Sequence, residues 1–398
     1  MKLAPVYAEL SRRANVDQLL VRTGEHYDAS VKDVFLDELL LPAPHIQLGV
    51  GSGLHGAQTA RALSGLEEVF VELRPDMVVV PGDVNSSLAA ALAAVKLEIP
   101  VCHIEAGLRS FNWSMPEEHN RRVTDHLSTL LLTHSRGANE NLAREGISHD
   151  GVQLVGNTMI DTLRSNVRAA RQLRTWAEYG VRPGKYVLVT LHRPALVDVP
   201  HLLERTMGCL EWLAGEIPVI FSVHPRTRDR LAALGAYGGR VQLVDPQPYG
   251  RFLCLEAGAA AVITDSGGVQ EETTALGVPC FTLRNNTERP ITVTHSTNTV
   301  IGLDPLRLLE VPERLREPRT RARPPLWDGR AGTRAAIQIE KAHGLQPPAR
   351  RRRVVATERR PRERQTEGRQ PALAESHSGP ATLDVRGLPP ERVHTTIR

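Results

Sequence analysis

The chain has 398 residues, of which 41% are hydrophobic and only 4% are aromatic. This length exceeds that of one ordinary domain, and apolar residues that are mostly Ala, Val and Leu favour parallel α/β layers over an all-β sandwich. The net charge is +4, but the segment after residue 345 carries 12 Arg and 6 acidic residues, a local +6, so the remainder carries −2. The main body therefore indicates no nucleic-acid partner.

The cysteines are scattered and show neither a C-x-x-C pair nor the spacing of a zinc site. Cys102 and Cys280 lie in strand-like apolar runs, which indicates buried free thiols and a reducing, cytoplasmic location. The chain has no signal-peptide core and no apolar run long enough to cross a bilayer, so we expect no membrane partner.

The N-terminus departs from the usual order of a doubly wound sheet. There the first strand lies centrally and is followed by phosphate-binding glycines. Here a helix-like stretch, 1–14, comes first, so we expect the N-terminal first strand to be missing and its two neighbours to lack a partner on one side. We expect that the start was assigned too late, at an internal Val or Ile codon. An intact N-terminus at Met1 would contradict this.

Short apolar runs then alternate with helical stretches as far as about Ile301. Continuous apolar runs are typical of strands buried on both faces, and the helices between them, such as 88–97 and 269–276, complete right-handed β-α-β units. The expected strands are Gln18–Arg22, Met77–Pro81, Pro100–Ile104, Leu130–Thr133 and Val152–Val155, followed by Tyr186–Leu191, Pro218–Val223, Val241–Val244, Ala261–Thr264 and Pro279–Leu283.

These runs form two sets, and the charged segment 161–183 separates them. We expect two Rossmann-like domains, 1–160 and 161–325, that face a cleft at the carboxyl ends of their strands. Val311–Pro325 is typical of a connector, and 326–345 should hold a terminal helix. The Arg- and Pro-rich segment 346–398 is typical of a disordered tail. Its Arg350–Arg353 run either binds an acidic surface or is solvated without a role.

Acidic side chains follow the strands of the first set. Asp83 ends the run Met77–Pro81, and Glu105 lies in His103–Arg109 at the end of the next. Glu117 opens a helix just after Pro116. These acids could simply cap helices or favour the helix dipole. If they converge, burial and mutual repulsion should raise the pKa of some of them, so that one acts as a base and another as an acid.

The second set contributes a histidine and a glycine-rich turn. His192 ends the run Tyr186–Leu191, where it is either structural or close to a phosphate. Ser266, Gly267 and Gly268 link a strand to a helix whose free N–H groups attract phosphate, and Glu272 lies one turn in, suited to ribose hydroxyls. The alternative is a glycine-rich turn without a function.

Three further motifs are weaker. Gly51–Gly56 fits G-x-G-x-x-G, which alone says little, and we expect a loop there. His224–Thr227 and Glu288–Pro290 also lie at strand ends, and either could be structural. Arg289 could pair with an anionic ligand.

Together the motifs resemble the non-hydrolysing UDP-N-acetylglucosamine 2-epimerases, in order and spacing, from residue 1 to about 345. The matching segments are Lys2–Pro5, Gly82–Asp83, His103–Arg109, Pro116–Glu118 with Asn120–Arg121, Gly156–Thr158, His192–Arg193, Asp265–Glu272 and Thr287–Pro290.

The resemblance implies the glycosyltransferase-B fold, a UDP-sugar substrate, no metal or redox cofactor, and a homodimer. It also implies removal of the proton at sugar C2 while UDP leaves C1, followed by re-addition of UDP and return of the proton to the other face. By motif position, Asp83, Glu105 and Glu117 form the acid/base set, with His192 near the phosphates. The resemblance implies a substrate-binding set of Lys2, Arg121, Phe252, Ser266, Gly267, Gly268, Glu272 and Arg289, in which Phe252 packs on the uracil.

Departures from the family pattern leave alternatives open. The opening strand and its Gly-Thr-Arg-Pro-Glu turn are missing, and 23–28 lacks the glutamines that bacterial members use to bind an activating second substrate molecule. Pro194 replaces a common Arg. The alternatives are an epimerase of a UDP-diacetamido sugar, a glycosyltransferase of the same fold, and an inactive nucleotide-sugar binding protein.

Overall fold

The computed structural model describes residues 1–24, 38–39, 41–148, 150–235, 239–295, 297–317 and 323–344, all within the compact unit Met1–Ala349. The expected tail 346–398 therefore lies outside the described residues. The same holds for most of the glutamine-lacking segment 23–28 and for part of the expected connector.

Each expected strand run contains an observed strand, although only the last two residues of the run 18–22 form one. The sequence did not predict β2, which has two residues, or β12, whose Asn-Thr-Val lacks an apolar run. The strands are β1 (Val21–Arg22), β2 (Ile46–Gln47), β3 (Val78–Pro81), β4 (Val101–Ala106), β5 (Leu130–Thr133), β6 (Val152–Leu154), β7 (Val187–Thr190), β8 (Val219–Ser222), β9 (Gln242–Val244), β10 (Ala261–Thr264), β11 (Cys280–Thr282) and β12 (Asn298–Val300).

The helices fill the connections between strands. They are α1 (Ala4–Leu10), α3 (His55–Leu73), α4 (Asn85–Lys96), α5 (Pro116–Leu127), α6 (Arg136–Arg144), α7 (Thr158–Gln172), α8 (Thr175–Glu178), α9 (Pro194–Val197), α10 (Pro200–Glu216), α11 (Pro225–Leu234), α12 (Tyr249–Gly258), α13 (Gly267–Leu276), α14 (Pro290–Thr294), the 3-10 helix η1 (Pro305–Glu310), α15 (Val311–Arg314) and α16 (Ala331–Gly344). Two expectations were too simple: α3 already begins inside the expected loop Gly51–Gly56, and the expected connector contains α15.

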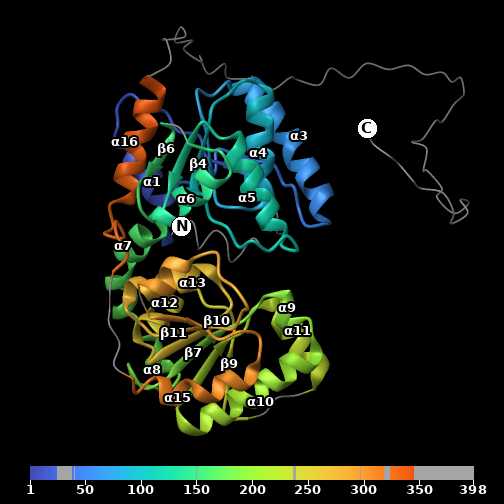
Figure 1. Cartoon of the computed structure of the whole chain (residues 1–398), viewed down its shortest axis with the longest axis vertical. Coiled ribbons are helices and arrows are strands. Elements are labelled where there is room, and N and C mark those ends of the chain that lie inside the picture. Colours follow the sequence, from blue (N-terminus) through green and yellow to red (C-terminus); the bar gives the residue numbers. More distant parts are fainter. Residues whose placement is uncertain are drawn as a thin grey trace, which may run out of the picture. The chain divides into compact units, whose positions relative to one another are not determined.

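The strands of the first half lie in two sheets, and all their pairs are parallel. The order β3-β4-β5-β6 forms one sheet, and β1 and β2 pair separately. Among the described strands, β3 and β6 are the edge strands of the larger sheet. One face of the larger sheet packs on α3 and α4 through Val78, Val80 and Val101. Figure 1 shows these helices beside β4.

The second half is one parallel sheet in the order β12-β11-β10-β7-β8-β9. Successive residues of a strand point to opposite faces. In β7, Val187 and Val189 face the cluster that contains α10 residues such as Leu210, whereas Leu188 faces the cluster that contains Leu255 of α12. Helices therefore cover both faces, which explains why these strands are continuous apolar runs.

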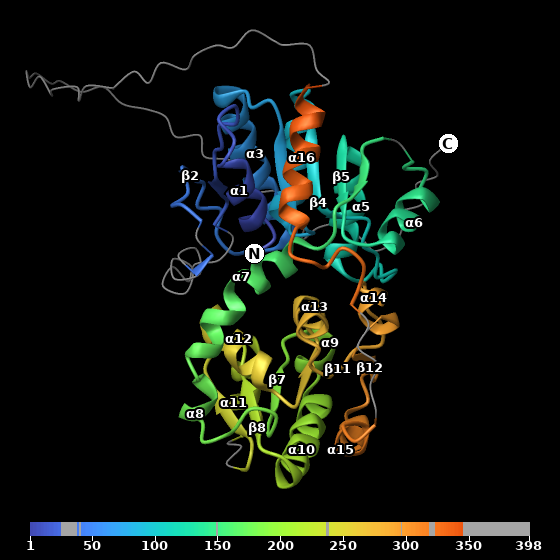
Figure 2. The ribbon, with the colours of Figure 1, turned by 90° about the vertical axis from the view of Figure 1, so that its left-hand side faces the viewer.

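The last described helix returns to the first half. α16 packs against α1, and Ala335, Ala336 and Ile339 join Ile104 and Leu132 in one apolar cluster. Figure 2 shows α16, in orange, running beside the strands β4 and β5. The chain thus crosses from the second sheet back to the first before the described part ends.

Candidate active site

Asp83 and Glu105 lie at the carboxyl ends of neighbouring strands, as expected. β3 and β4 pair in parallel up to Pro81 and Ile104; Glu105 follows directly, and Asp83 follows after Gly82. Glu105 adopts φ 72°, a left-handed conformation that is rare for residues other than Gly, and the β4–β5 register shifts between Ile104 and Ala106. Such a bulge redirects a side chain at the end of a strand. Here it brings the Glu105 carboxylate to Lys2, with which it forms an ion pair.

Three cations surround these two carboxylates. Lys2 pairs with Glu105, Arg121 pairs with Asp83, and Arg289 Nη2 lies 3.3 Å from Glu105 Oε1. Arg289 comes from the second half of the chain, so residues of both halves contribute to the cluster. Gly82 leaves room for the Lys2 side chain, because a Cβ at position 82 would lie 2.5 Å from Lys2 Nζ.

The cations decide the charge of both acids. Burial alone would raise the pKa of Asp83, but Lys2, Arg121 and Arg289 outweigh burial and hold the pKa below its usual value. Burial alone would also raise the pKa of Glu105, but Lys2 and Arg289 outweigh burial and hold this pKa below its usual value. The upward pKa shift expected for some of the acids is thus not found for these two, because oppositely charged side chains from distant segments stabilise their ionised forms. Both are ionised in this structure.

Two buried carboxyls on α13 have raised pKa values. Burial raises the pKa of Glu272 to about 7, against a hydrogen bond from Tyr249, whose hydroxyl lies 2.8 Å from Glu272 Oε1. Burial also raises the pKa of Glu271 to about 7, although Arg289 lowers it. Glu272 was predicted as a ligand residue, whereas Tyr249 and Glu271 carried no signal in the sequence.

The glycine-rich turn begins α13, as expected. Ser266 is the N-cap residue, and Gly267 and Gly268 are the first two residues of the helix. A Cβ at Gly267 would overlap Arg289 Nη1, and one at Gly268 would lie 3.1 Å from Met159 Cε. A side chain at Gly267 would therefore displace the Arg289 guanidinium, and one at Gly268 would press on the end of Met159. The free N–H groups of the first turn are suited to an anion.

His192 lies at the end of β7 and is oriented by an acid. Its Nδ1 is 2.9 Å from Asp265 Oδ1, and Asp265 Oδ2 accepts hydrogen bonds from the backbone N–H groups of His192 (2.8 Å) and Arg193 (2.7 Å). The ring is one-third exposed, at 33%. Asp265 is buried, so it fixes this loop while the imidazole stays accessible.

Glu117 is in the first turn of α5, with 39% of its side chain exposed, and its Oε1 lies 3.8 Å from Arg193 Nη1 of the second half. The adjacent Glu118 has a structural position. It is buried and accepts hydrogen bonds from Ser110 N (2.8 Å) and Phe111 N (3.2 Å). The structure therefore leaves Glu117 as the accessible acid of this pair.

Phe252 lies on α12 and packs, half-buried, against an apolar cluster of the second sheet. Its expected contact with uracil stays a prediction.

A buried network that the sequence did not reveal supports the Glu105 loop. Asp125 Oδ1 lies 2.7 Å from His103 Nδ1, and Asp125 Oδ2 accepts hydrogen bonds from Gly107 N (3.1 Å) and Arg109 Nη1 (2.7 Å). All of these residues come from α5 or the end of β4. The network holds the backbone directly after Glu105.

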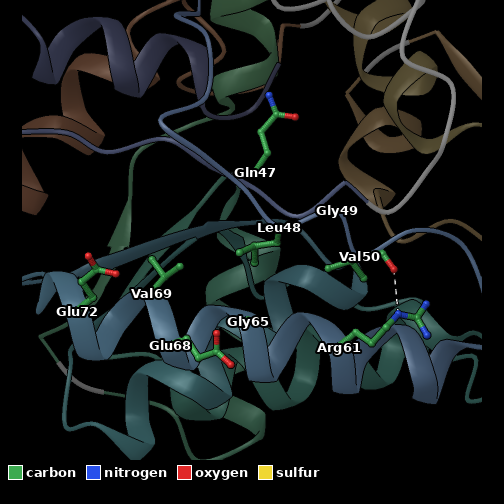
Figure 3. Close-up of a pocket in the computed structure, with 9 residues that line it drawn as sticks. All are labelled: Gln47, Leu48, Gly49, Val50, Arg61, Gly65, Glu68, Val69 and Glu72. Carbon is green, nitrogen blue, oxygen red and sulfur yellow. Dashed lines mark hydrogen bonds between the residues drawn. The ribbon is translucent and has the colours of Figure 1, made fainter. Parts of the chain in front are cut away.

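A separate pocket of about 350 Å³ lies along α3 and the loop after β2. Figure 3 shows its nine lining residues, among them Glu68 and Glu72 on α3 and Arg61, which donates a hydrogen bond to the Val50 carbonyl oxygen. None of the nine belongs to the acid cluster. We therefore do not assign the chemistry to this pocket.

Within the described residues, no group of three or more His, Cys, Asp or Glu side chains is placed to hold a metal ion. The helices of the same residues include none that is both long and apolar enough to cross a membrane. All four cysteines are buried and unpaired with one another.

Two parallel sheets, with strand ends that share one cluster of acids and cations and a Ser-Gly-Gly helix start, define a protein of the glycosyltransferase-B fold class. The sequence profile of the family described as UDP-N-acetylglucosamine 2-epimerase matches residues 8–340, and the chain belongs to this family.

Relatives and solved structures support the same membership. The UDP-N-acetylglucosamine 2-epimerase of Methanocaldococcus jannaschii is 40% identical over 344 residues, which are 84% of this chain and 94% of that protein. The UDP-2,3-diacetamido-2,3-dideoxy-D-glucuronate 2-epimerase of Pseudomonas aeruginosa is 38% identical over 306 residues, 76% of this chain and 85% of that one.

Among solved structures, the M. jannaschii UDP-GlcNAc 2-epimerase in complex with UDP-GlcNAc and UDP has a TM-score of 0.79 at 39% identity and covers 86% of this chain and 96% of its own. The Neisseria meningitidis UDP-GlcNAc 2-epimerase bound to UDP-GlcNAc has a TM-score of 0.76 at 28% identity, with 85% of this chain and 96% of that chain covered. The resemblance and the fold expected from the sequence are confirmed.

Proposed function

We propose that the chain converts UDP-N-acetylglucosamine reversibly into UDP-N-acetylmannosamine by elimination and re-addition of UDP. The observation that carries the proposal is the convergence of Asp83 and Glu105 with Lys2, Arg121 and Arg289 at strand ends. Carboxylates can move the C2 proton, and the cations can hold a diphosphate. Membership of the epimerase family supports the same reaction.

The chemistry requires two carboxyl groups in different protonation states. An ionised carboxylate takes the C2 proton while the bond between C1 and the UDP oxygen breaks, which leaves a glycal with a C1–C2 double bond. A protonated carboxyl then gives a proton to the opposite face of C2 while UDP rejoins C1. We assign Asp83, Glu105 and Glu117 jointly to this work. Asp83 and Glu105 suit the base, because their cations keep them ionised.

We propose that UDP binds at the start of α13. The Ser266 hydroxyl and the N–H groups of Gly267 and Gly268 would face the phosphates, while Arg121, Arg289 and His192 supply further donors. Glu272, oriented by the Tyr249 hydroxyl, would accept hydrogen bonds from the ribose, and Phe252 would pack on the uracil. Lys2 would adjoin the sugar through its pair with Glu105. No metal or redox cofactor takes part in this proposal.

A second candidate substrate is a UDP-diacetamido sugar, because a relative with this printed activity is 38% identical over most of the chain. The elimination at C1 and C2 is the same for both substrates, so the acid cluster does not distinguish them. A nucleotide-sugar binding protein without turnover is the third candidate.

The test is to incubate the full chain separately with UDP-N-acetylglucosamine and with a UDP-2,3-diacetamido uronate, and to follow both by proton NMR. We expect the anomeric signal of UDP-N-acetylmannosamine from the first. Product only from the second would support the diacetamido substrate. Binding of both without any product would contradict the enzymatic proposal and support a binding protein.

We further propose a homodimer in the cytoplasm without a nucleic-acid partner. The resemblance supports the dimer. The four buried cysteines form no disulfide with one another, which supports a reducing compartment. The charge of −2 before residue 346 supports the absence of a nucleic-acid partner. Light scattering at micromolar concentration tests the oligomeric state, and a monomer would contradict it.

A further inference from the structure

Two buried side chains next to the acid cluster have polar atoms without partners. His134 follows β5 and is 2% exposed, and Glu271 on α13 is 0% exposed. Neither ring nitrogen of His134 has a hydrogen-bond partner among the described residues, nor has Oε2 of Glu271, whereas Glu271 Oε1 is paired with Arg289. His134 Nε2 lies 3.7 Å from Glu271 Oε1. Unpaired buried polar atoms are costly, so three of them side by side call for an explanation.

The charged groups that face this pair are those of the acid cluster. Arg289 Nε lies 3.0 Å from Glu271 Oε1, and Nη2 of the same guanidinium lies 3.3 Å from Glu105 Oε1. Lys2 forms an ion pair with Glu105, and its charge also acts on Glu271 and His134. The indole of Trp327 donates a hydrogen bond of 3.3 Å to the His134 carbonyl oxygen, which fixes the backbone there. One arginine therefore joins Glu271 to Glu105.

We propose that Glu271 and His134 hold one proton between them and, through Arg289, set how strongly Glu105 binds its own proton. They would be positioning residues for the epimerisation, and the inference rests on the proposed function.

The charges of the pair follow from its burial. Burial raises the pKa of Glu271 to about 7, partly offset by Arg289 and reinforced by Glu105. Burial lowers the pKa of His134 to about 4, against the charge of Glu105. Between about pH 4 and about pH 7 the pair therefore holds one titratable proton, which is on Glu271, and His134 is neutral. When Glu271 is protonated, the positive charge of Arg289 acts mainly on Glu105 and favours its ionised form. When Glu271 is ionised, it pairs with Arg289 and adds a negative charge near Glu105, which favours protonation of Glu105.

This coupling suits a reaction in which a carboxyl must change its protonation state at each turnover. Lys2 and Arg289 together hold Glu105 strongly in its ionised form. A neighbour that titrates near neutral pH reduces this bias, and the effect is reciprocal, because two charges act on each other equally. Glu105 can then gain and lose a proton at moderate cost.

The test compares the pH dependence of kcat/KM in the full chain and its variants. In Glu271→Gln the neighbour is always neutral, so the change in kcat/KM as the pH rises through about 7, where Glu271 loses its proton, should disappear. In His134→Gln the amide donates a hydrogen bond to Glu271 and favours its ionised form, so this change should move to lower pH. The double variant should behave as Glu271→Gln alone. A merely structural role would not remove the change in one variant and move it in the other.

Asp161→Asn is the matched control, because Asp161 is another largely buried carboxyl with a raised pKa, which hydrogen-bonds Gly332 N at 2.7 Å away from the acid cluster. It should leave the change near pH 7 in place. A change near pH 7 that persists in Glu271→Gln or in the double variant would overturn the proposal.

An infrared titration of the unreacted protein separates this inference from the proposed function. Between pH 6 and 8 the protonated-carboxyl band should lose a component that Glu271→Gln lacks, and the carboxylate band of Glu105 should shift over the same pH range only in the protein that keeps Glu271. If no turnover occurs with either sugar, the proposed function fails and these spectra still decide the coupling. Identical spectra from both proteins would overturn it.

Discussion

Glu105 is the residue where backbone, charge and chemistry meet. Its left-handed φ of 72° places the carboxylate between Lys2 and Arg289, which keep it ionised. A general base contributes about 10²- to 10⁴-fold to a rate. In Glu105→Gln we expect kcat to fall by that factor. UDP should bind equally or more tightly, because both cations lose a negative partner.

Turnover assays together with calorimetric UDP titration test this variant. Weaker UDP binding with an unchanged kcat would contradict the assignment.

Gly267 tests the start of α13. An alanine Cβ would overlap Arg289 Nη1 and approach Arg289 Cζ to 2.7 Å. Because the guanidinium would have to move from its three acidic partners, we expect Gly267→Ala to weaken UDP binding about tenfold or more, equivalent to about 1.4 kcal/mol. Fluorescence or calorimetric titration with UDP measures it.

Gly56→Ala is the control for this variant. Gly56 is in the first turn of α3, and an added Cβ would meet nothing within 4 Å. Equal UDP affinities in the two variants would contradict the close-approach argument.

At the scale of elements, Asp125 ties α5 to the end of β4. Burial would raise its pKa, but His103 and Arg109 outweigh burial and hold the pKa below its usual value. A depressed folded-state pKa stabilises the protein above the unfolded value of about 3.9, and this stability is lost as the pH falls through the folded pKa. We therefore expect the free energy of unfolding to decline as the pH falls below about 4.

Asp125→Asn should lower the free energy of unfolding at pH 7 by about 1–3 kcal/mol, because it weakens the hydrogen bonds of the buried His103 and Gly107 N–H, while Arg109 keeps its ion pair with Glu145. Its unfolding should also depend less on pH in the acid range. Urea unfolding at pH 7 and pH 3.5 measures both effects. An unchanged acid dependence would show that Asp125 is not responsible for it.

Much of the site follows from the sequence, because continuous apolar runs mark the strands and active sites form where parallel strands end. That reasoning brings Asp83 and Glu105 together. Asp125, His134 and Tyr249 carry no such mark, since their partners are distant in the chain and only the fold buries them. The lowered pKa of Glu105 could not be predicted for the same reason, because Arg289 is 184 residues away.

At the scale of the whole molecule, the docking of α16 on α1 joins the end of the described chain to its beginning. We propose that 1–160 and 161–325 are domains and that 326–345 belongs structurally with the first. α7, where the boundary falls, contacts α1, α12, α13 and α16. Mutations in α16 should therefore destabilise the first sheet, although they lie after the second in sequence.

Gly332→Ala tests this docking. A Cβ at Gly332 would lie 2.8 Å from the backbone C and O atoms of Pro5. Overpacking of this kind costs about 1–3 kcal/mol, which we expect as a loss in the free energy of unfolding. Gly208→Ala in α10 is the control, because its Cβ would meet nothing within 4 Å and alanine favours a helix by about 1 kcal/mol. Denaturant unfolding of both variants measures these changes. A Gly332→Ala variant that is as stable as the wild type would contradict the docking argument.

The most direct test of the account is the fate of the C2 proton. UDP-N-acetylglucosamine should be incubated with the full chain in deuterated water, and the C2 position of the product and the recovered substrate should be examined by proton NMR. We predict deuterium at C2 of the UDP-N-acetylmannosamine formed, since different carboxyl groups remove and return the proton. Product that retains protium at C2 would contradict deprotonation at this carbon, and with it the acid/base roles of Asp83, Glu105 and Glu117.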